Sequence, residues 1–154
     1  RARRPHPERT RREEPVVLRD IGAIIAGLAV SIAVIMAVQM VGHTLWPAPD
    51  GLNWNDTEVI RTYTSQLPFL ALLFPIVSYF LGALAGPYVA CRIGTAQPLL
   101  MVGVIGLVLL AFTVANLIQL PHPVWFSVSA IAAVIIGGWL AWQLGASARR
   151  KALS

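Results

Sequence analysis

Residues 21–46 read IGAIIAGLAVSIAVIMAVQMVGHTLW, and no Asp, Glu, Lys or Arg interrupts them. About 20 apolar residues are enough for a helix to cross the ~30 Å hydrocarbon layer of a bilayer. The run exceeds the apolar core of a secretory signal, which has about 7–15 residues. No small-x-small cleavage motif follows it. We therefore interpret this stretch as a genuine transmembrane helix.

Three further apolar stretches follow, at residues 67–90, 98–120 and 124–146. A helix satisfies every backbone amide of a lipid-exposed segment from within that segment. Hydrophobic residues make up 56% of the 154-residue chain and charged residues only 12%, about half the usual charged share. The sequence therefore predicts an all-α polytopic membrane protein, with four transmembrane helices in an antiparallel bundle over residues 21–146.

The basic residues lie almost entirely outside the apolar stretches. Of twelve Arg and Lys, seven precede Asp20 and three occupy residues 149–151. When alternate connecting segments are grouped, eleven bases lie on one side and one on the other. Because loops rich in Arg and Lys stay in the cytoplasm, both termini are expected there (N-in, C-in). The arm 1–20 and the tail 147–154 are then cytoplasmic, and the loop 47–66 is external.

The N-terminal arm is rich in Arg and poor in apolar residues, so it has no means of forming a core and is expected to be disordered over residues 1–20. Anionic headgroups attract such an arm by about 1 kcal/mol per base. An acidic partner subunit is the alternative target. Since the bases flank apolar segments, the net charge of +5 favours these partners over nucleic acid. The arginines concerned are Arg1, Arg3, Arg4, Arg9, Arg11 and Arg12.

The external loop contains a helix-start signal. Asp56 precedes Thr57 and Glu58, and an Asp side chain accepts hydrogen bonds from the free amides at a helix start. We expect a short helix here, with an apolar face on the membrane surface. That face would consist of Val59, Ile60 and Tyr63.

Small residues mark the expected helix contacts. Gly82 and Gly86 stand four apart and share one helix face, where another backbone can approach closely. Glycine is also simply common in membrane helices, which is the alternative explanation. Pro75 lies mid-span and predicts a kink. The candidate packing positions are Gly82, Gly86, Gly103, Gly106, Gly137 and Gly138.

Five polar residues are expected at one depth, near the external ends of the first and third spans. If those spans are close, the five would line one outer pocket. They either bond between helices and cap helix ends, or His43 and His122 bind a metal, a haem iron or a quinone carbonyl. Two histidines fall short of a usual metal ligand set. The five are Gln39, His43, Asn116, Gln119 and His122.

Two segments resemble a group of small uncharacterised bacterial inner-membrane proteins. One is Gly42-His-Thr-Leu-Trp-Pro-Ala-Pro-Asp-Gly51 followed by Asn55-Asp56, and the other is Leu120-Pro-His-Pro-Val-Trp-Phe126. The group has a His and a Pro-rich loop after its first span and often Pro-His-Pro before its last, although this chain has fewer prolines in the loop. The resemblance implies a four-helix inner-membrane protein over residues 21–146 and no particular reaction.

No span contains an ionisable Asp, Glu, Lys or Arg, and Cys91 is the only cysteine. Proton relays, charged channel rings and thiol exchange all lack the residues they require. We therefore expect no enzyme activity, no cofactor and no metal. The leading hypothesis is a non-catalytic accessory or scaffold subunit of a larger, possibly energy-transducing, membrane complex. The alternatives are a small oligomeric transporter or channel, and a haem- or quinone-handling redox protein using His43 and His122.

Overall fold

The computed structural model describes residues 7–53, 55–119 and 122–153. The described residues form five helices and no strand: α1 (Pro7–Leu45), α2 (Thr57–Gln66), α3 (Phe69–Ile93), α4 (Pro98–Gln119) and α5 (Val124–Leu153). All but α2 contain a stretch long and apolar enough to cross a membrane. The prediction of an all-α chain with four such helices is confirmed. These four helices are compatible with a multi-pass membrane protein.

Helix α1 begins much earlier than the sequence suggested. It is continuous from Pro7 to Leu45, whereas disorder was expected throughout residues 1–20. The physical reason is that a helix started by the apolar span extends at little cost, and Arg and Glu are good helix formers. At 1.5 Å per residue the 39-residue helix is about 58 Å long, nearly twice the thickness of the hydrocarbon layer.

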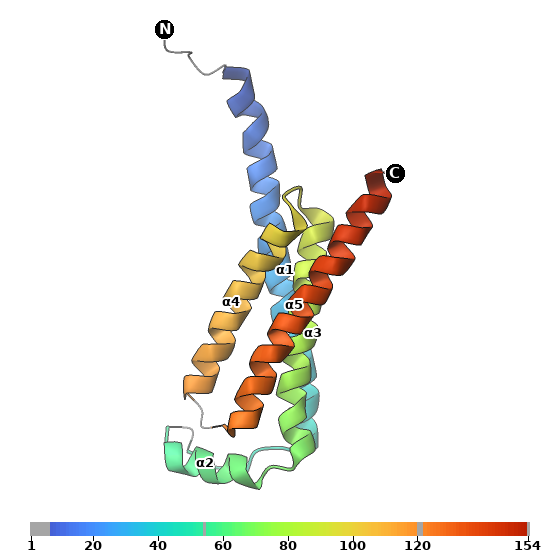
Figure 1. Ribbon diagram of the computed structural model, residues 1–154. Coiled ribbons are helices and arrows are strands. Elements are labelled where there is room, and N and C mark those ends of the chain that lie inside the picture. The colour runs from blue at the N-terminus through green and yellow to red at the C-terminus, as the bar shows by residue number, and fades with distance from the viewer. Residues whose placement is uncertain (1–6, 54, 120–121, 154) are drawn as a thin grey trace.

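The arginines of the expected arm fall into two groups. Arg9, Arg11 and Arg12 belong to α1, and Arg1, Arg3 and Arg4 lie outside the described residues. Helix α5 likewise continues to Leu153, through most of the expected C-terminal tail. Figure 1 shows that the start of α1 and the end of α5 lie at the same end of the molecule and diverge there.

Helix α3 is the central element of the fold. Its most extensive contacts are with α1 and α5, it also contacts α4, and α1 and α4 touch each other only slightly. Tyr79, Ala83 and Ala90 on α3 are buried, together with Met101 and Ile105 on α4. The helix continues through Pro75 and Pro87 without a break. Because α3 lies between its neighbours, most of the core is built on its faces.

Glycine allows α1 and α3 to approach closely. A Cβ atom built on Gly27 would lie 2.8 Å from the Gly86 carbonyl oxygen, and one built on Gly86 would overlap the Gly27 carbonyl oxygen and the Ser31 hydroxyl. A Cβ on Gly82 would lie 2.6 Å from Ile35. The Ser31 hydroxyl donates a hydrogen bond of 2.9 Å to the Gly82 carbonyl oxygen. Gly82 and Gly86 therefore lie in the α1–α3 contact.

The other four candidate glycines differ among themselves. Gly137 packs on α3, where an added Cβ would lie 2.6 Å from the Phe80 carbonyl oxygen. A Cβ on Gly138 would be in ordinary contact with Val102, at 3.7 Å. Nothing lies within 4 Å of a Cβ built on Gly103 or Gly106. Within the described part of this chain, those two glycines on α4 are not packing positions, because the third span turns this face outward.

A polar clamp joins α1 to the α3–α4 turn. One carboxylate oxygen of Asp20 accepts hydrogen bonds from the Thr95 amide at 2.5 Å, the Thr95 hydroxyl at 2.8 Å and the Ala96 amide at 3.1 Å. Beside it, Arg19 Nε donates to the Ile93 carbonyl oxygen at 2.9 Å. The turn amides and a helix-terminal carbonyl thus obtain partners from a segment about 75 residues away in sequence.

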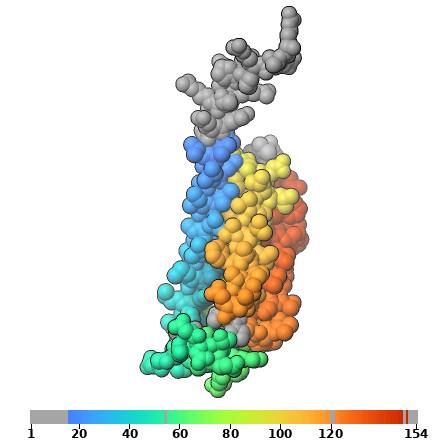
Figure 2. Space-filling model, turned by 90° about the vertical axis from the view of Figure 1, so that its left-hand side faces the viewer, coloured from blue at the N-terminus to red at the C-terminus, as the bar shows by residue number. Residues whose placement is uncertain are grey.

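The opposite end of the molecule is covered by α2. Figures 1 and 2 show this short helix lying across the ends of the longer helices. The Asp56 side chain caps it by accepting from the Glu58 amide at 3.0 Å and the Val59 amide at 3.4 Å, which confirms the predicted helix start. Ile60, a residue of α2 itself, is buried and only 4% exposed. Part of the expected apolar face therefore packs on the protein itself.

Candidate functional site: an aromatic pocket beneath α2

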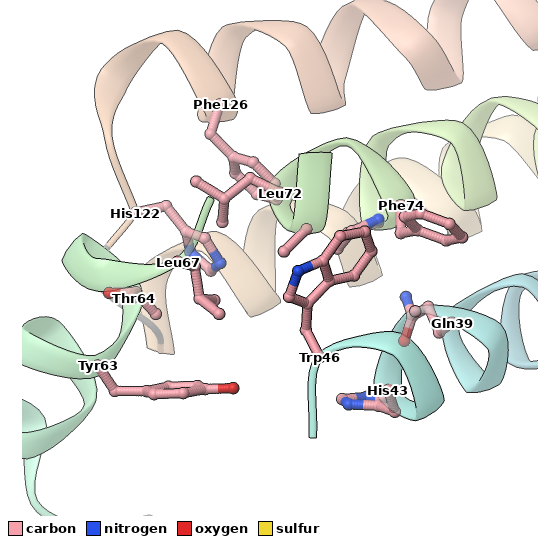
Figure 3. Close-up of a pocket in the computed structure, with 13 residues that line it drawn as sticks. Gln39, His43, Trp46, Tyr63, Thr64, Leu67, Leu72, Phe74, His122 and Phe126 are labelled. Atoms are coloured by element: carbon pink, nitrogen blue, oxygen red, sulfur yellow. The ribbon is translucent and has the colours of Figure 1, made fainter. Parts of the chain in front are cut away.

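A cavity of about 160 Å³ lies beneath α2. It is formed by the end of α1, the end of α2, the beginning of α3 and the turn before α5. Figure 3 shows its side chains converging from these elements. The lining residues are Gln39, Gly42, His43, Trp46, Tyr63, Thr64, Leu67, Ala71, Leu72, Phe74, Pro75, His122 and Phe126.

The last turns of α1 supply one wall. Gln39, His43 and Trp46 follow one another at spacings of four and three, which places them on the same face of a helix. The Trp46 amide donates to the Gly42 carbonyl oxygen at 2.9 Å, so the helical path persists to the indole-bearing residue. Gln39, His43 and Trp46 therefore form one continuous wall of the pocket.

One polar side chain of this wall is held in place by α3. Gln39 Nε2 donates to the Ser78 hydroxyl at 3.3 Å, and that hydroxyl donates to the Pro75 carbonyl oxygen at 2.7 Å. A primary amide has two N–H donors and a carbonyl acceptor. After the bond to Ser78, one donor and the carbonyl oxygen of Gln39 still have the capacity to bind a guest.

Aromatic rings form the flat surfaces of the pocket. Trp46 meets Phe74 edge to face, with centroids 5.5 Å apart and planes at 61°. The imidazole of His122 stacks on Phe126, with centroids 4.4 Å apart and planes within 9°. Phe126 is only 1% exposed, so its ring is a fixed support. The pocket therefore offers rigid, flat walls to whatever enters it.

The structure brings together three of the five polar residues predicted for this site. Gln39, His43 and His122 line the cavity. Asn116 instead donates a 2.8 Å hydrogen bond to the Tyr79 hydroxyl of α3, and Gln119 is exposed at the end of α4. The reason is the position of α3 between the first and third spans, which the sequence left open.

The aromatic residues of the pocket were not predicted from the sequence. Trp46 stands three residues after His43, a spacing that places both on one helix face and was an available signal. Tyr63, Phe74 and Phe126 come from three other elements, and only the fold brings them together. The predicted polar pocket is thus an aromatic pocket with polar groups on its sides.

The pocket has the chemistry of a binding site for a neutral guest. Among the residues that the structure describes, its lining contains no Arg, Lys, Asp or Glu. Within the described residues, no group of three or more His, Cys, Asp or Glu side chains is placed to hold a metal ion. Comparison of the chain with protein-family models, curated proteins and solved structures finds no match.

Proposed function

We propose that the protein crosses the bacterial inner membrane as an antiparallel four-helix bundle and acts as a non-catalytic accessory or scaffold subunit of a larger membrane complex. The main support is how the spans use their polar side chains. Ser31 bonds to α3, Thr113 donates to the Leu109 carbonyl oxygen at 2.9 Å, and Asn116 bonds to Tyr79. These groups stabilise the protein's own helices rather than lining a path through them.

The helical extensions favour a partner in the cytoplasm. Helix α1 is about 58 Å long by its 1.5 Å rise per residue, and its first turns contain Arg9, Arg11 and Arg12. Helix α5 ends in the basic residues 149–151. Both extensions lie at one end of the molecule, and the eleven-to-one distribution of bases supports the proposal that this end faces the cytoplasm. Together they offer a partner two basic helices.

The outward faces of the spans favour further contacts within the membrane. The apolar window of α1 is the least buried of the four, at 17%, and Ile25, Ile32 and Met36 are exposed on it. On α4, Gly103 is also exposed and has open space in front of it. Lipid covers such faces in isolation, and another subunit's helix gains close backbone contact at the glycine.

The decisive experiment is gentle extraction from the native membrane followed by native mass measurement. A stable complex with larger subunits is the expected result. A homo-oligomer alone would favour the transporter or channel alternative, and a co-purifying haem would favour the redox alternative. Either result, without larger partners, would contradict the accessory role.

The role of the arm is tested by deleting residues 1–14. A matched control replaces Arg1, Arg3, Arg4, Arg9, Arg11 and Arg12 by Lys, which retains the charge that attracts anionic lipid. Lysine lacks the planar, two-pronged hydrogen bonding by which Arg holds carboxylates. Loss of the complex in both variants indicates an acidic protein partner. If the complex is retained in both variants, the arm has no role in assembly.

A further inference from the structure

We propose that the pocket beneath α2 binds the head ring of a membrane quinone, an oxidised six-membered ring with carbonyl oxygens at opposite positions. This inference does not depend on the accessory role, because an isolated chain has the complete pocket. It rests on the size of the cavity, the chemistry of its walls and the placement of its hydrogen-bonding groups.

The size of the cavity selects a single ring. Its volume is about 160 Å³, and an apolar cavity of about 150 Å³ in another protein is known to accept benzene. Sites for larger, drug-sized molecules typically have volumes of about 300–1,000 Å³. A haem is therefore too large for this space. Since the cavity is only partly enclosed, a ring can enter while its hydrocarbon tail remains outside.

The walls select a flat and uncharged ring. Trp46 and Phe74 present aromatic surfaces, and aromatic rings attract one another in stacked or edge-to-face arrangements at centroid distances of about 4.5–7 Å. A phosphate or carboxylate headgroup would require a cation, and the described part of the lining contains neither Arg nor Lys. The pocket thus disfavours the polar part of a phospholipid.

The hydrogen-bonding groups select carbonyl oxygens over a plain hydrocarbon. Gln39 has a second amide N–H beyond the one that bonds to Ser78, and His43 has an imidazole that bonds to no other side chain in the described part of the chain. His122 enters from another element, and Figure 3 shows it on a different side of the pocket from His43 and Gln39. An alkyl chain would cover the second Gln39 N–H and the His43 imidazole without offering either a hydrogen-bond partner. A quinone carbonyl oxygen offers these two groups an acceptor.

The test uses the full chain in lipid nanodiscs and a benzoquinone with a decyl tail as the probe. We expect saturable binding of one quinone per chain, measured by equilibrium titration. His43→Leu is expected to weaken binding about five- to tenfold, the value of one hydrogen bond, and His43→Gln to restore most of it. Ala71→Phe, which fills the cavity, is expected to abolish binding. Gln119→Leu, at an exposed polar residue outside the pocket, is the matched control and should bind normally.

Several results would overturn the proposal. The first is absence of saturable binding to the unaltered protein. The second is unchanged binding in both His43→Leu and Ala71→Phe. The third is equal competition by decanol, which has the same tail without a ring and would identify an alkyl-chain site instead. Thermal unfolding of each variant distinguishes loss of the site from loss of the fold.

Discussion

Replacing Gly86 by Ala is expected to separate α1 from α3. The added methyl group would overlap the Gly27 carbonyl oxygen and the Ser31 hydroxyl, and it would approach the Ser31 Cβ to 3.0 Å. A backbone oxygen has no rotamer by which to move aside, so the helices themselves must shift. Overpacking of this kind typically costs about 1–3 kcal/mol.

The shift has a second cost. The Ser31 hydroxyl and the Gly82 carbonyl oxygen, now 2.9 Å apart, would lose their hydrogen bond. Such bonds between membrane helices contribute about 0.6–1.7 kcal/mol. Helix propensity works in the opposite direction, because Ala is better than Gly by up to about 1 kcal/mol. We therefore expect a net destabilisation of about 1–4 kcal/mol, the balance of these three contributions.

The assay is reversible unfolding in mixed micelles, with helix content followed as the denaturing detergent is increased. Gly103→Ala is the matched control, since nothing lies within 4 Å of the Cβ it would add. This control gains the same helix propensity without the overlap and is expected to equal or exceed the unaltered protein in stability. If Gly86→Ala and Gly103→Ala unfold at the same detergent fraction, the close α1–α3 contact is refuted.

Substitutions at three further contacts test other parts of the fold. Asp20→Ala removes the acceptor for three hydrogen bonds and should destabilise the fold by about 1–3 kcal/mol in the same unfolding assay, while Asp20→Asn, which retains an acceptor, should cost less. Asn116→Leu and Tyr79→Phe should each cost about 1 kcal/mol, and the double variant should cost less than their sum, because both break one bond. Asp56→Ala should loosen the start of α2 by about 0.5–2 kcal/mol, seen as faster hydrogen exchange of its first amides with no change in the long helices.

The sequence predicted the elements of the fold better than their arrangement. The four apolar runs were recognisable because lipid requires long, uncharged helices, and the start of α2 was recognisable because Asp56 is a strong local signal. The start of α1 was missed because helix extension from a stable span depends on that span and not on local apolar content. Which element lies in the centre depends on contacts distant in sequence, so the role of α3 was not predictable.

The candidate site shows the same limit. Gln39 and His43 share a helix face, and this local spacing made their proximity predictable. The proximity of Asn116 to these two residues depended on where the third span packs. In the structure, the Asn116 amide instead donates a hydrogen bond to the Tyr79 hydroxyl on α3. The Asp20 clamp was also missed, since a carboxylate beside an apolar run resembles any boundary residue until the α3–α4 turn is placed next to it.

The clamp also constrains the order in which the protein matures. Asp20 reaches Thr95 across 75 residues of chain, and synthesis at about 5–20 residues per second takes roughly 4–15 s to cover that interval. During that time the first span is already made while the turn that its carboxylate will hold does not yet exist. The newly made α1 must therefore wait until the α3–α4 turn has been synthesised before Asp20 finds its partners. Closing the clamp then joins α1 to the α3–α4 turn, before α5 is complete.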